Sequence, residues 1–308
     1  MADGTERRDD VKEDDVQDEA RYAPPGEKRR DGGGRGDPNG GEKPQGQRNG
    51  QAASERVGEV GSGPPPEDTI IELRDLHKSF GDLDVLNGAS LAVEDGTSAV
   101  VMGGSGAGKS VLLKHVVKLL TPDYGEPWVK GRRVDQMTGG ELDDLRLSIG
   151  YLFQGGALFD SMSVEENMNF FLRRHSDLSE GERQDRIEET LSWVKLEDTA
   201  PKYPAELSGG QQKRIGLARA IVLQPEILLY DEPTTGLDPV SVRTVSELIV
   251  RLRDERGISS VAITHDLLCA EIIADRAHFI YEGKILESGS LEDLKHSDHP
   301  ALRNFFGS

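Results

Sequence analysis

The feature that most restricts the fold is a glycine-rich stretch between an apolar run and a helical pattern. Residues 97–102 form a short apolar run typical of a buried strand. They are followed by GGSGAGKS from Gly103 to Ser110, and then by a helical pattern over 110–120 that ends before Pro122. Glycines let backbone N–H groups turn toward an anion, and the start of a helix attracts negative charge. The spacing predicts a phosphate-binding loop.

The same stretch supplies the groups that a nucleoside triphosphate with a bound metal requires. Lys109 is expected to reach the β- and γ-phosphates, and Ser110 to offer its hydroxyl to Mg²⁺. A plain glycine-rich turn is the alternative, but the Lys-Ser pair and the flanking pattern favour the phosphate site. We expect ATP and Mg²⁺ as cofactors. The loop residues expected to bind ATP are Gly103, Gly104, Ser105, Gly106, Ala107, Gly108, Lys109 and Ser110.

A second candidate phosphate element is the apolar run 227–230 followed by Asp231 and Glu232. Asp231 comes 121 residues after Ser110. Asp231 is expected to hold Mg²⁺, usually through water. Glu232 is expected to orient the attacking water or accept its proton. Neighbouring side chains on a strand point to opposite faces, so these two tasks require the backbone to bend at the pair.

Apolar runs alternate with amphipathic stretches from residue 67 to the end, which predicts an α/β fold with a mostly parallel sheet. We expect strands at 69–76, 85–93, 97–102, 128–134, 149–153, 226–230 and 258–264, and a hairpin over 277–287 that turns at Glu282 and Gly283. Helices are expected at 110–120, 163–195 with a break near Asp177, 209–223 and 239–255.

Residues 1–66 differ in composition from the rest of the chain. They contain 13 Gly and 7 Pro, but only four residues of the Leu, Ile, Val and Phe types, all of them Val. So little apolar surface cannot offset the entropy of ordering the segment. We expect a disordered tail over 1–66, with a docking or regulatory role as the alternative, and one folded domain over 67–308.

Charge, cysteine content and hydropathy exclude several classes of protein. The net charge is −19, of which −15 falls on residues 67–308, so a broad basic face for nucleic acid is not expected. The single cysteine, Cys269, excludes an internal disulfide and is expected to be buried on a helix. No apolar run approaches the ~20 residues that span a bilayer. We expect a cytosolic protein whose membrane role comes through a partner.

Leu207 to Gln211 read LSGGQ, 97 residues after Ser110 and 24 before Asp231. In this order the string resembles the signature of ATP-binding cassette (ABC) proteins. The resemblance covers residues 69 to about 290. It implies an ATP-hydrolysing P-loop NTPase cassette with an antiparallel β subdomain and an inserted helical subdomain at about 155–222. It also implies a head-to-tail homodimer, in which the signature of one copy caps the γ-phosphate of the other through Ser208, Gly209, Gly210 and Gln211.

Four more residues match the order of motifs in this family. Phe80 stands where the family places an aromatic ring on adenine, although a core or turn aromatic is the alternative. Gln154 resembles the glutamine that reaches Mg²⁺ and couples to the permease, and Asp238 resembles the aspartate that contacts the opposite P-loop. His265 resembles the switch histidine that contacts the γ-phosphate. The implied catalytic set is Glu232, His265 and Gln154, and the implied metal set is Ser110, Gln154 and Asp231.

Three stretches resemble the ATPases of Mce/Mla-type lipid transporters, the MlaF and Mkl-like proteins. They are residues 103–115, with Val111 where many cassettes have Thr, residues 155–168, and the ending 295–307. This resemblance implies a MlaE-like integral membrane permease, an Mce protein, a phospholipid or other apolar lipid as cargo, and a peripheral location at the cytoplasmic face of the inner membrane. Five apolar side chains are expected to line a groove for a permease coupling helix, with core packing as the alternative: Ala157, Leu158, Phe159, Met162 and Val164.

Three other functions compete with lipid transport. The chain could power an ABC transporter for amino acids or drugs, which its generic motifs also allow. A cassette protein of translation or DNA repair is disfavoured, since the chain has one P-loop, one LSGGQ and no sustained heptads. A module that binds ATP without hydrolysing it is disfavoured by the presence of Glu232 and His265.

Overall fold

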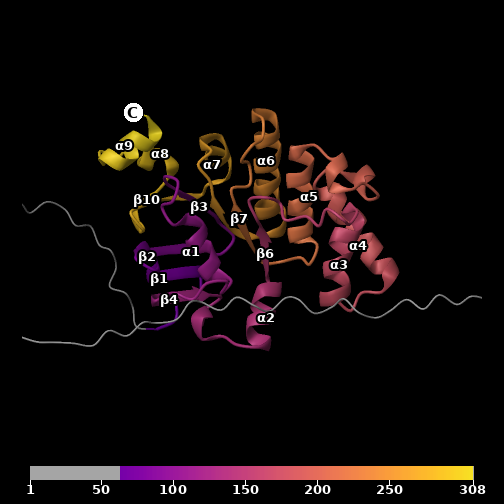
Figure 1. The fold of residues 1–308 in the computed structure, drawn as a ribbon, viewed down its shortest axis with the longest axis horizontal. Helices are drawn as coiled ribbons and strands as arrows, with labels where there is room; N and C mark the ends of the chain where they lie inside the picture. The colour runs from indigo at the N-terminus through magenta and orange to yellow at the C-terminus, as the bar shows by residue number, and fades with distance from the viewer. Residues whose placement is uncertain (1–62, 308) are drawn as a thin grey trace, which may run out of the picture. The chain divides into compact units, whose positions relative to one another are not determined.

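The computed structural model describes residues 63–307, and the expected tail lies outside this range except for its last four residues. A six-stranded sheet has the strand order β10-β9-β3-β8-β7-β6 (Figure 1). The strands from β9 to β6 are all parallel, and β10 joins the edge antiparallel. The bounds are β3 Ser98–Met102, β6 Ile149–Leu152, β7 Ile227–Asp231, β8 Ser259–Ile263, β9 Arg276–Tyr281 and β10 Lys284–Gly289.

A second, antiparallel sheet of four strands lies beside α1 (Lys109–Val116), with the order β2-β1-β4-β5 (Figure 1). Its strands are β1 Thr69–Phe80, β2 Leu83–Glu94, β4 Tyr124–Val129 and β5 Arg132–Arg133. In β2, buried and exposed residues alternate from Ala89 to Glu94, which is the pattern of a strand with one face on the core.

The remaining helices follow the strands in sequence. Helix α2 (Gly140–Leu147) precedes β6, and three helices lie between β6 and β7: α3 Val164–His175, α4 Glu180–Trp193 and α5 Gly209–Ile221. They are followed by α6 Pro239–Arg256, α7 Leu267–Ile273, α8 Leu291–Lys295 and α9 Pro300–Phe306. Short 3₁₀ turns occupy Val134–Gln136, Glu197–Thr199 and Pro204–Glu206.

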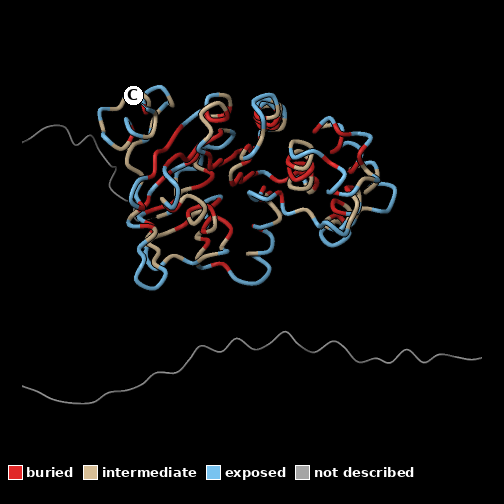
Figure 2. The backbone as a smooth tube through the Cα atoms, turned by 45° about the horizontal axis from the view of Figure 1, so that its top comes forward, coloured by how far each residue is buried: buried red, intermediate tan, exposed pale blue. Residues whose placement is uncertain are grey.

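The central strands are buried on both faces, as Figure 2 shows in red. All five residues of β3, of β7 and of β8 are buried, which explains why they read as continuous apolar runs. Successive residues of β3 join different cores: Val100 and Met102 pack in one apolar cluster, and Ala99 and Val101 in the other. The sheet therefore separates two hydrophobic cores.

The fold class is confirmed: a mostly parallel core sheet, an antiparallel sheet and inserted helices. The break near Asp177 is also confirmed, and it lies between two helices whose starts are fixed by capping boxes, Ser163 with Glu166 and Ser179 with Glu182. The hairpin turn at Glu282 and Gly283 is present, and Cys269 is buried on α7.

The expected secondary structure was wrong at one strand and lacked one helix. The strand expected over 128–134 ends at Val129, because Lys130 and Gly131 take positive φ and form a turn before the short β5. Helix α2 was not expected at all, and α7 was expected only as a helix of unstated bounds around Cys269. No helix within residues 63–307 combines the length and apolar character needed to cross a membrane.

Candidate functional site

The loop between β3 and α1 can be built only with glycine at two points. Gly103 and Gly108 have φ of +157° and +97°. A Cβ on Gly103 would lie 2.4 Å from the carbonyl oxygen of Ile280, and one on Gly108 would lie 2.8 Å from that of Val85. No side chain caps the start of α1, so its first N–H groups remain available for an anion. The local geometry is that of an anion cradle.

Lys109 lies across this loop. Its Nζ donates hydrogen bonds to the carbonyl oxygens of Gly103, at 2.9 Å, and Gly104, at 2.8 Å. Burial lowers the pKa of the Lys109 ammonium, while the nearby carboxylates of Glu232 and Asp231 act in the opposite direction. If a polyanion were bound in the loop, its oxygens would be stronger hydrogen-bond acceptors for the Lys109 ammonium than these two carbonyl oxygens.

Ser110 and Asp231 meet although they are far apart in the sequence. The Ser110 hydroxyl donates a 2.9 Å hydrogen bond to Oδ1 of Asp231, which is only 7% exposed. Asp231 ends β7, and Ser110 lies in the first turn of α1 after β3, in the same sheet. A hydroxyl and a carboxylate side by side are hard oxygen donors of the kind that Mg²⁺ prefers.

Glu232 is turned away from the path of β7. Its φ is +54°, so the backbone bends immediately after Asp231, as separate roles for the two carboxylates require. Its Oε2 lies 2.9 Å from Nδ1 of His265, which follows β8, and it accepts a 2.9 Å hydrogen bond from the Thr235 hydroxyl. Among the described residues, Oε1 of Glu232 has no hydrogen-bond partner. The carboxylate is thus oriented with one oxygen free.

These groups surround one cavity of about 610 Å³. Three polar residues expected from the sequence, Gln154, Glu232 and His265, join the phosphate loop in lining it. The complete lining is Val85, Gly103, Gly104, Ser105, Gly106, Ala107, Gly108, Lys109, Ser110, Val111, Gln154, Glu232, His265 and Phe305. The convergence of a cationic loop, a free carboxylate oxygen and a histidine suits the hydrolysis of a phosphoanhydride.

Other expected site residues do not line this cavity. Phe80 is 47% exposed, and the ammonium of Lys78 lies 5.6 Å from the centre of its ring. Ser208 and Gln211 border a separate small hollow with Ser241, where Ser208 caps α5 through a capping box with Gln211. Asp238 caps α6 by accepting hydrogen bonds from the backbone of Val240 and Ser241 and from the Ser241 hydroxyl.

Lys213 is a site residue to which no role was assigned from the sequence. Its Nζ, on a residue only 8% exposed, donates to the carbonyl oxygens of Gln154 and of Glu232, the latter at 3.3 Å. Burial lowers the pKa of this ammonium, with the charges of Glu232 and Asp231 opposing the shift. A signal was present: Lys213 is a lone basic residue on the otherwise apolar buried side of α5.

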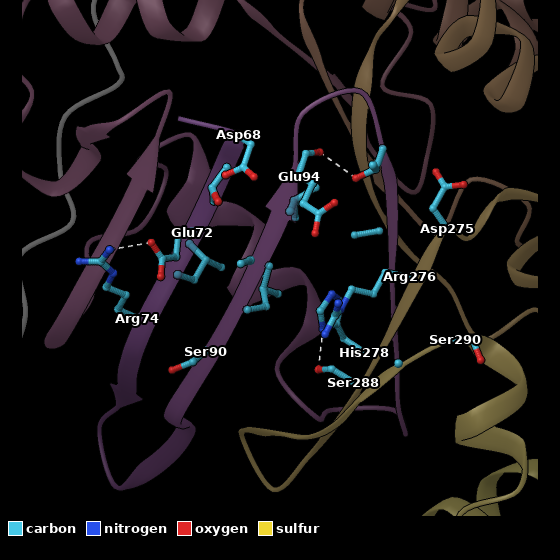
Figure 3. A pocket seen from close by; sticks show the side chains of 18 residues that line it. Asp68, Glu72, Arg74, Ser90, Glu94, Asp275, Arg276, His278, Ser288 and Ser290 are labelled. Atoms are coloured by element: carbon cyan, nitrogen blue, oxygen red, sulfur yellow. Dashed lines mark hydrogen bonds and ion pairs between the residues drawn. The ribbon is translucent and has the colours of Figure 1, made fainter. Parts of the chain in front are cut away.

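The chain has a second hollow, of about 660 Å³, between the antiparallel sheet and the β9–β10 hairpin (Figure 3). Four carboxylates line it, from Asp68, Glu72, Glu94 and Asp275, against the guanidinium groups of Arg74 and Arg276. A triphosphate would meet repulsion from these carboxylates, so this hollow is less suited to a nucleotide than the cavity at the phosphate loop.

The fold and the site together define an ATP-binding cassette. A phosphate loop follows the buried strand β3, a carboxylate pair stands at the end of the buried strand β7, and Ser208 of the LSGGQ sequence caps helix α5. The family model described as "ABC transporter" matches residues 86–235. The chain belongs to this family, and it is an ATP-hydrolysing cassette of the ABC type.

Relatives and a solved structure agree with this assignment. The chain is 40% identical over 255 residues to Protein TRIGALACTOSYLDIACYLGLYCEROL 3, chloroplastic, of Arabidopsis thaliana, covering 77% of this chain and 73% of that one. It is 36% identical over 228 residues to the intermembrane phospholipid transport system ATP-binding protein MlaF of Haemophilus influenzae, covering 74% and 86%. It is 37% identical over 241 residues to the methionine import ATP-binding protein MetN 2 of Pseudomonas entomophila, covering 77% and 72%.

One solved structure to which the chain is similar is a dimeric ATP-binding cassette bound to ADP and Pi in a post-hydrolysis state. It matches with a TM-score of 0.66 and 29% identity, and the match covers 72% of this chain and 99% of that one.

Proposed function

We propose that this cassette holds MgATP in the 610 Å³ cavity, works as a head-to-tail dimer, and powers lipid transport through a membrane permease. Lys109 and the loop N–H groups bind the β- and γ-phosphates. Ser110, Asp231 and Gln154 are the residues that would hold Mg²⁺, which would neutralise charge on the phosphates.

Glu232 is the general base in this proposal. Oε2 is engaged by Thr235 and His265, so Oε1 is left to accept a hydrogen bond and then a proton from the attacking water. His265 is 60% exposed at its side chain, so it also has room to reach the γ-phosphate. The proposal depends on one observation: Lys109, Glu232 and His265 line the same cavity, and Ser110, which also lines it, donates a hydrogen bond to Asp231.

A second copy of the chain completes the site. Ser208, Gly210 and Gln211 line a hollow other than the one that contains the phosphate loop, so a single chain leaves the signature without a nucleotide. The exposed serine at the start of α5 is an anion-seeking helix end. A two-fold dimer would place it on the γ-phosphate held by the partner.

The permease is proposed to dock on the helices inserted between β6 and β7. Met162 and Phe170 line a hollow of about 490 Å³ there, together with Glu166, Asn169, Arg173 and Arg174. Phe159 and Phe170 are 39% and 41% exposed, with ring centres 5.3 Å apart. A hollow lined by both apolar and charged side chains suits a short amphipathic partner helix. Of the five side chains expected in this groove, Met162 lines the hollow, whereas Val164 is fully buried in the core.

The cargo is proposed to be a phospholipid or another apolar lipid, taken up with a MlaE-like permease and an Mce protein at the cytoplasmic face of the inner membrane. The name of the MlaF relative supports this cargo, and so do the lipid-transporter motifs at 103–115 and 155–168. The name of MetN 2 supports an amino acid as the alternative. Purification of the complex from native membranes, followed by identification of the bound lipids and the partner proteins, separates the two. A complex without lipid and without an Mce protein would overturn the lipid proposal.

The dimer has its own test, which mixes two inactive variants. Lys109→Ala removes the phosphate contact, and Ser208→Arg blocks the signature. In a head-to-tail heterodimer, both defects fall in one site and the other site is intact, so ATP turnover rises above that of either parent. If each chain used its own signature, no intact site would form and the mixture would stay inactive. Mixing Lys109→Ala with itself at the same total concentration is the control.

A further inference from the structure

Helix α9, which belongs to none of the motifs expected from the sequence, contributes a side chain to the lining of the cavity at the phosphate loop. Helix α9 ends at Phe306, and the ring of Phe305 lines the cavity together with Val85 of β2. With Val111 of α1, these are the apolar side chains that reach the cavity from outside the loop, whereas Gln154, Glu232 and His265 are the polar ones. An ATP molecule has the same division, with a polyanionic end and a flat apolar base.

The position of Phe305 is held firmly by its surroundings. Its ring packs edge-on against buried Phe279, with ring centres 5.1 Å apart at 66°. Leu302, one turn earlier on α9, is fully buried. The hairpin that precedes α8 and α9 is tied to β2, because Asn87 N–H donates a 2.9 Å hydrogen bond to the carbonyl oxygen of Gly283. Figure 1 shows α8 and α9 beside β10.

We propose that Phe305 packs against the base of the bound nucleotide and makes α9 part of the ATP site. Phe80, the aromatic expected on adenine, does not line the cavity, whereas Phe305 does. The inference rests on the proposed placement of the triphosphate on Lys109. It predicts that α9 contributes to affinity for the base and leaves the binding of phosphate alone unchanged.

The direct test is a fluorescent reporter in full-length protein. Phe305→Trp is expected to change its emission when ADP is added, because an indole stacked on a purine is quenched. Phe306→Trp is the matched control, since Phe306 lies next in the chain and does not line the cavity. Emission of Phe305→Trp that does not respond to saturating ADP, whose binding is verified independently, would overturn the inference.

Affinity gives a second readout. Phe305→Leu keeps the apolar packing on Phe279 and is expected to weaken ATP binding by about 3- to 10-fold, the usual worth of an aromatic stack. Binding of inorganic triphosphate is expected to stay within twofold of wild type. Equal loss for ATP and triphosphate would mean that α9 only supports the loop, and would contradict the inference. Lys109→Ala separates the two proposals: if it does not weaken triphosphate binding, the phosphate assignment itself has failed.

Discussion

Nδ1 of His265 lies 2.9 Å from Oε2 of Glu232, and this pair joins the ends of two neighbouring parallel strands, β8 and β7. The positive φ of Glu232 turns its side chain toward this partner, while Asp231 faces Ser110. One bend in the backbone thus separates two adjacent carboxylates into two environments, one beside the Ser110 hydroxyl and one beside the His265 ring.

Glu232→Gln is expected to slow ATP hydrolysis by about 100-fold or more, because an amide cannot accept the proton from water. ATP binding should be retained, since the amide keeps the shape and one oxygen, and the ATP-bound dimer should accumulate. Steady-state turnover and size-exclusion chromatography with ATP measure both effects. Glu226→Gln, at an exposed carboxylate before β7, is the control and should behave as wild type. Normal turnover by Glu232→Gln would disprove the role of Glu232.

Lys109→Ala is expected to weaken ATP binding by about 10- to 100-fold, the loss of charge-assisted hydrogen bonds to phosphate. Isothermal titration with ATP at constant ionic strength measures it. Lys114→Ala, one turn further along α1, removes the same charge from a position that does not line the cavity. Similar affinities in the two variants would contradict the phosphate assignment.

The sequence predicts the parts of this site that are local. The phosphate loop is fixed by eight consecutive residues, and the bend at Glu232 follows from the alternation of side chains on a strand. Helix α2 escapes prediction because its sequence GELDDLRL has one buried residue, Leu145, and so lacks an apolar face. Lys213 and Phe305 could not be predicted for another reason. Lys213 contacts Glu232, 19 positions later, and Phe305 shares a cavity with Gly103, more than 200 positions earlier. Only the folded tertiary structure brings such residues together.

Lys213→Met is expected to lower stability and turnover together. The ammonium joins the backbone of Gln154 to that of Glu232, and its loss leaves two carbonyl groups with one donor fewer. The cost of an unsatisfied buried group is about 1–3 kcal/mol, which lowers the melting temperature by about 2–12 °C for a domain of this size. Lys284→Met, at an exposed position of β10, controls for loss of charge. An unchanged melting temperature and turnover in Lys213→Met would show that the bridge contributes nothing.

His278 gives the chain a stability that depends on pH. It is 2% exposed on β9, and its Nδ1 lies 2.8 Å from the Ser288 hydroxyl (Figure 3). Burial, helped by the charge of Arg276, lowers the pKa of His278 from 6.5 to about 4. The unfolded chain therefore binds this proton more tightly than the folded chain. The stabilising contribution is complete above pH 6.5 and is lost as the pH falls from 6.5 toward 4.

The shift corresponds to a loss of up to about 3 kcal/mol in the free energy of unfolding between pH 7.5 and pH 4. Urea denaturation at pH 7.5, 6 and 5 measures this change in wild type and in His278→Gln, which cannot bind the proton. The variant should lose less stability than wild type as the pH falls, whatever its stability at pH 7.5. Buried His115, whose pKa is also lowered by burial, is present in both proteins and cancels in the comparison. His296→Gln, at an exposed site on the same chain, should follow wild type. The predicted difference arises because His278 binds a proton in the unfolded chain but stays neutral in the folded chain over most of this pH range. If the free energy of unfolding of wild type and of His278→Gln changed in parallel with pH, the lowered pKa of His278 would be refuted.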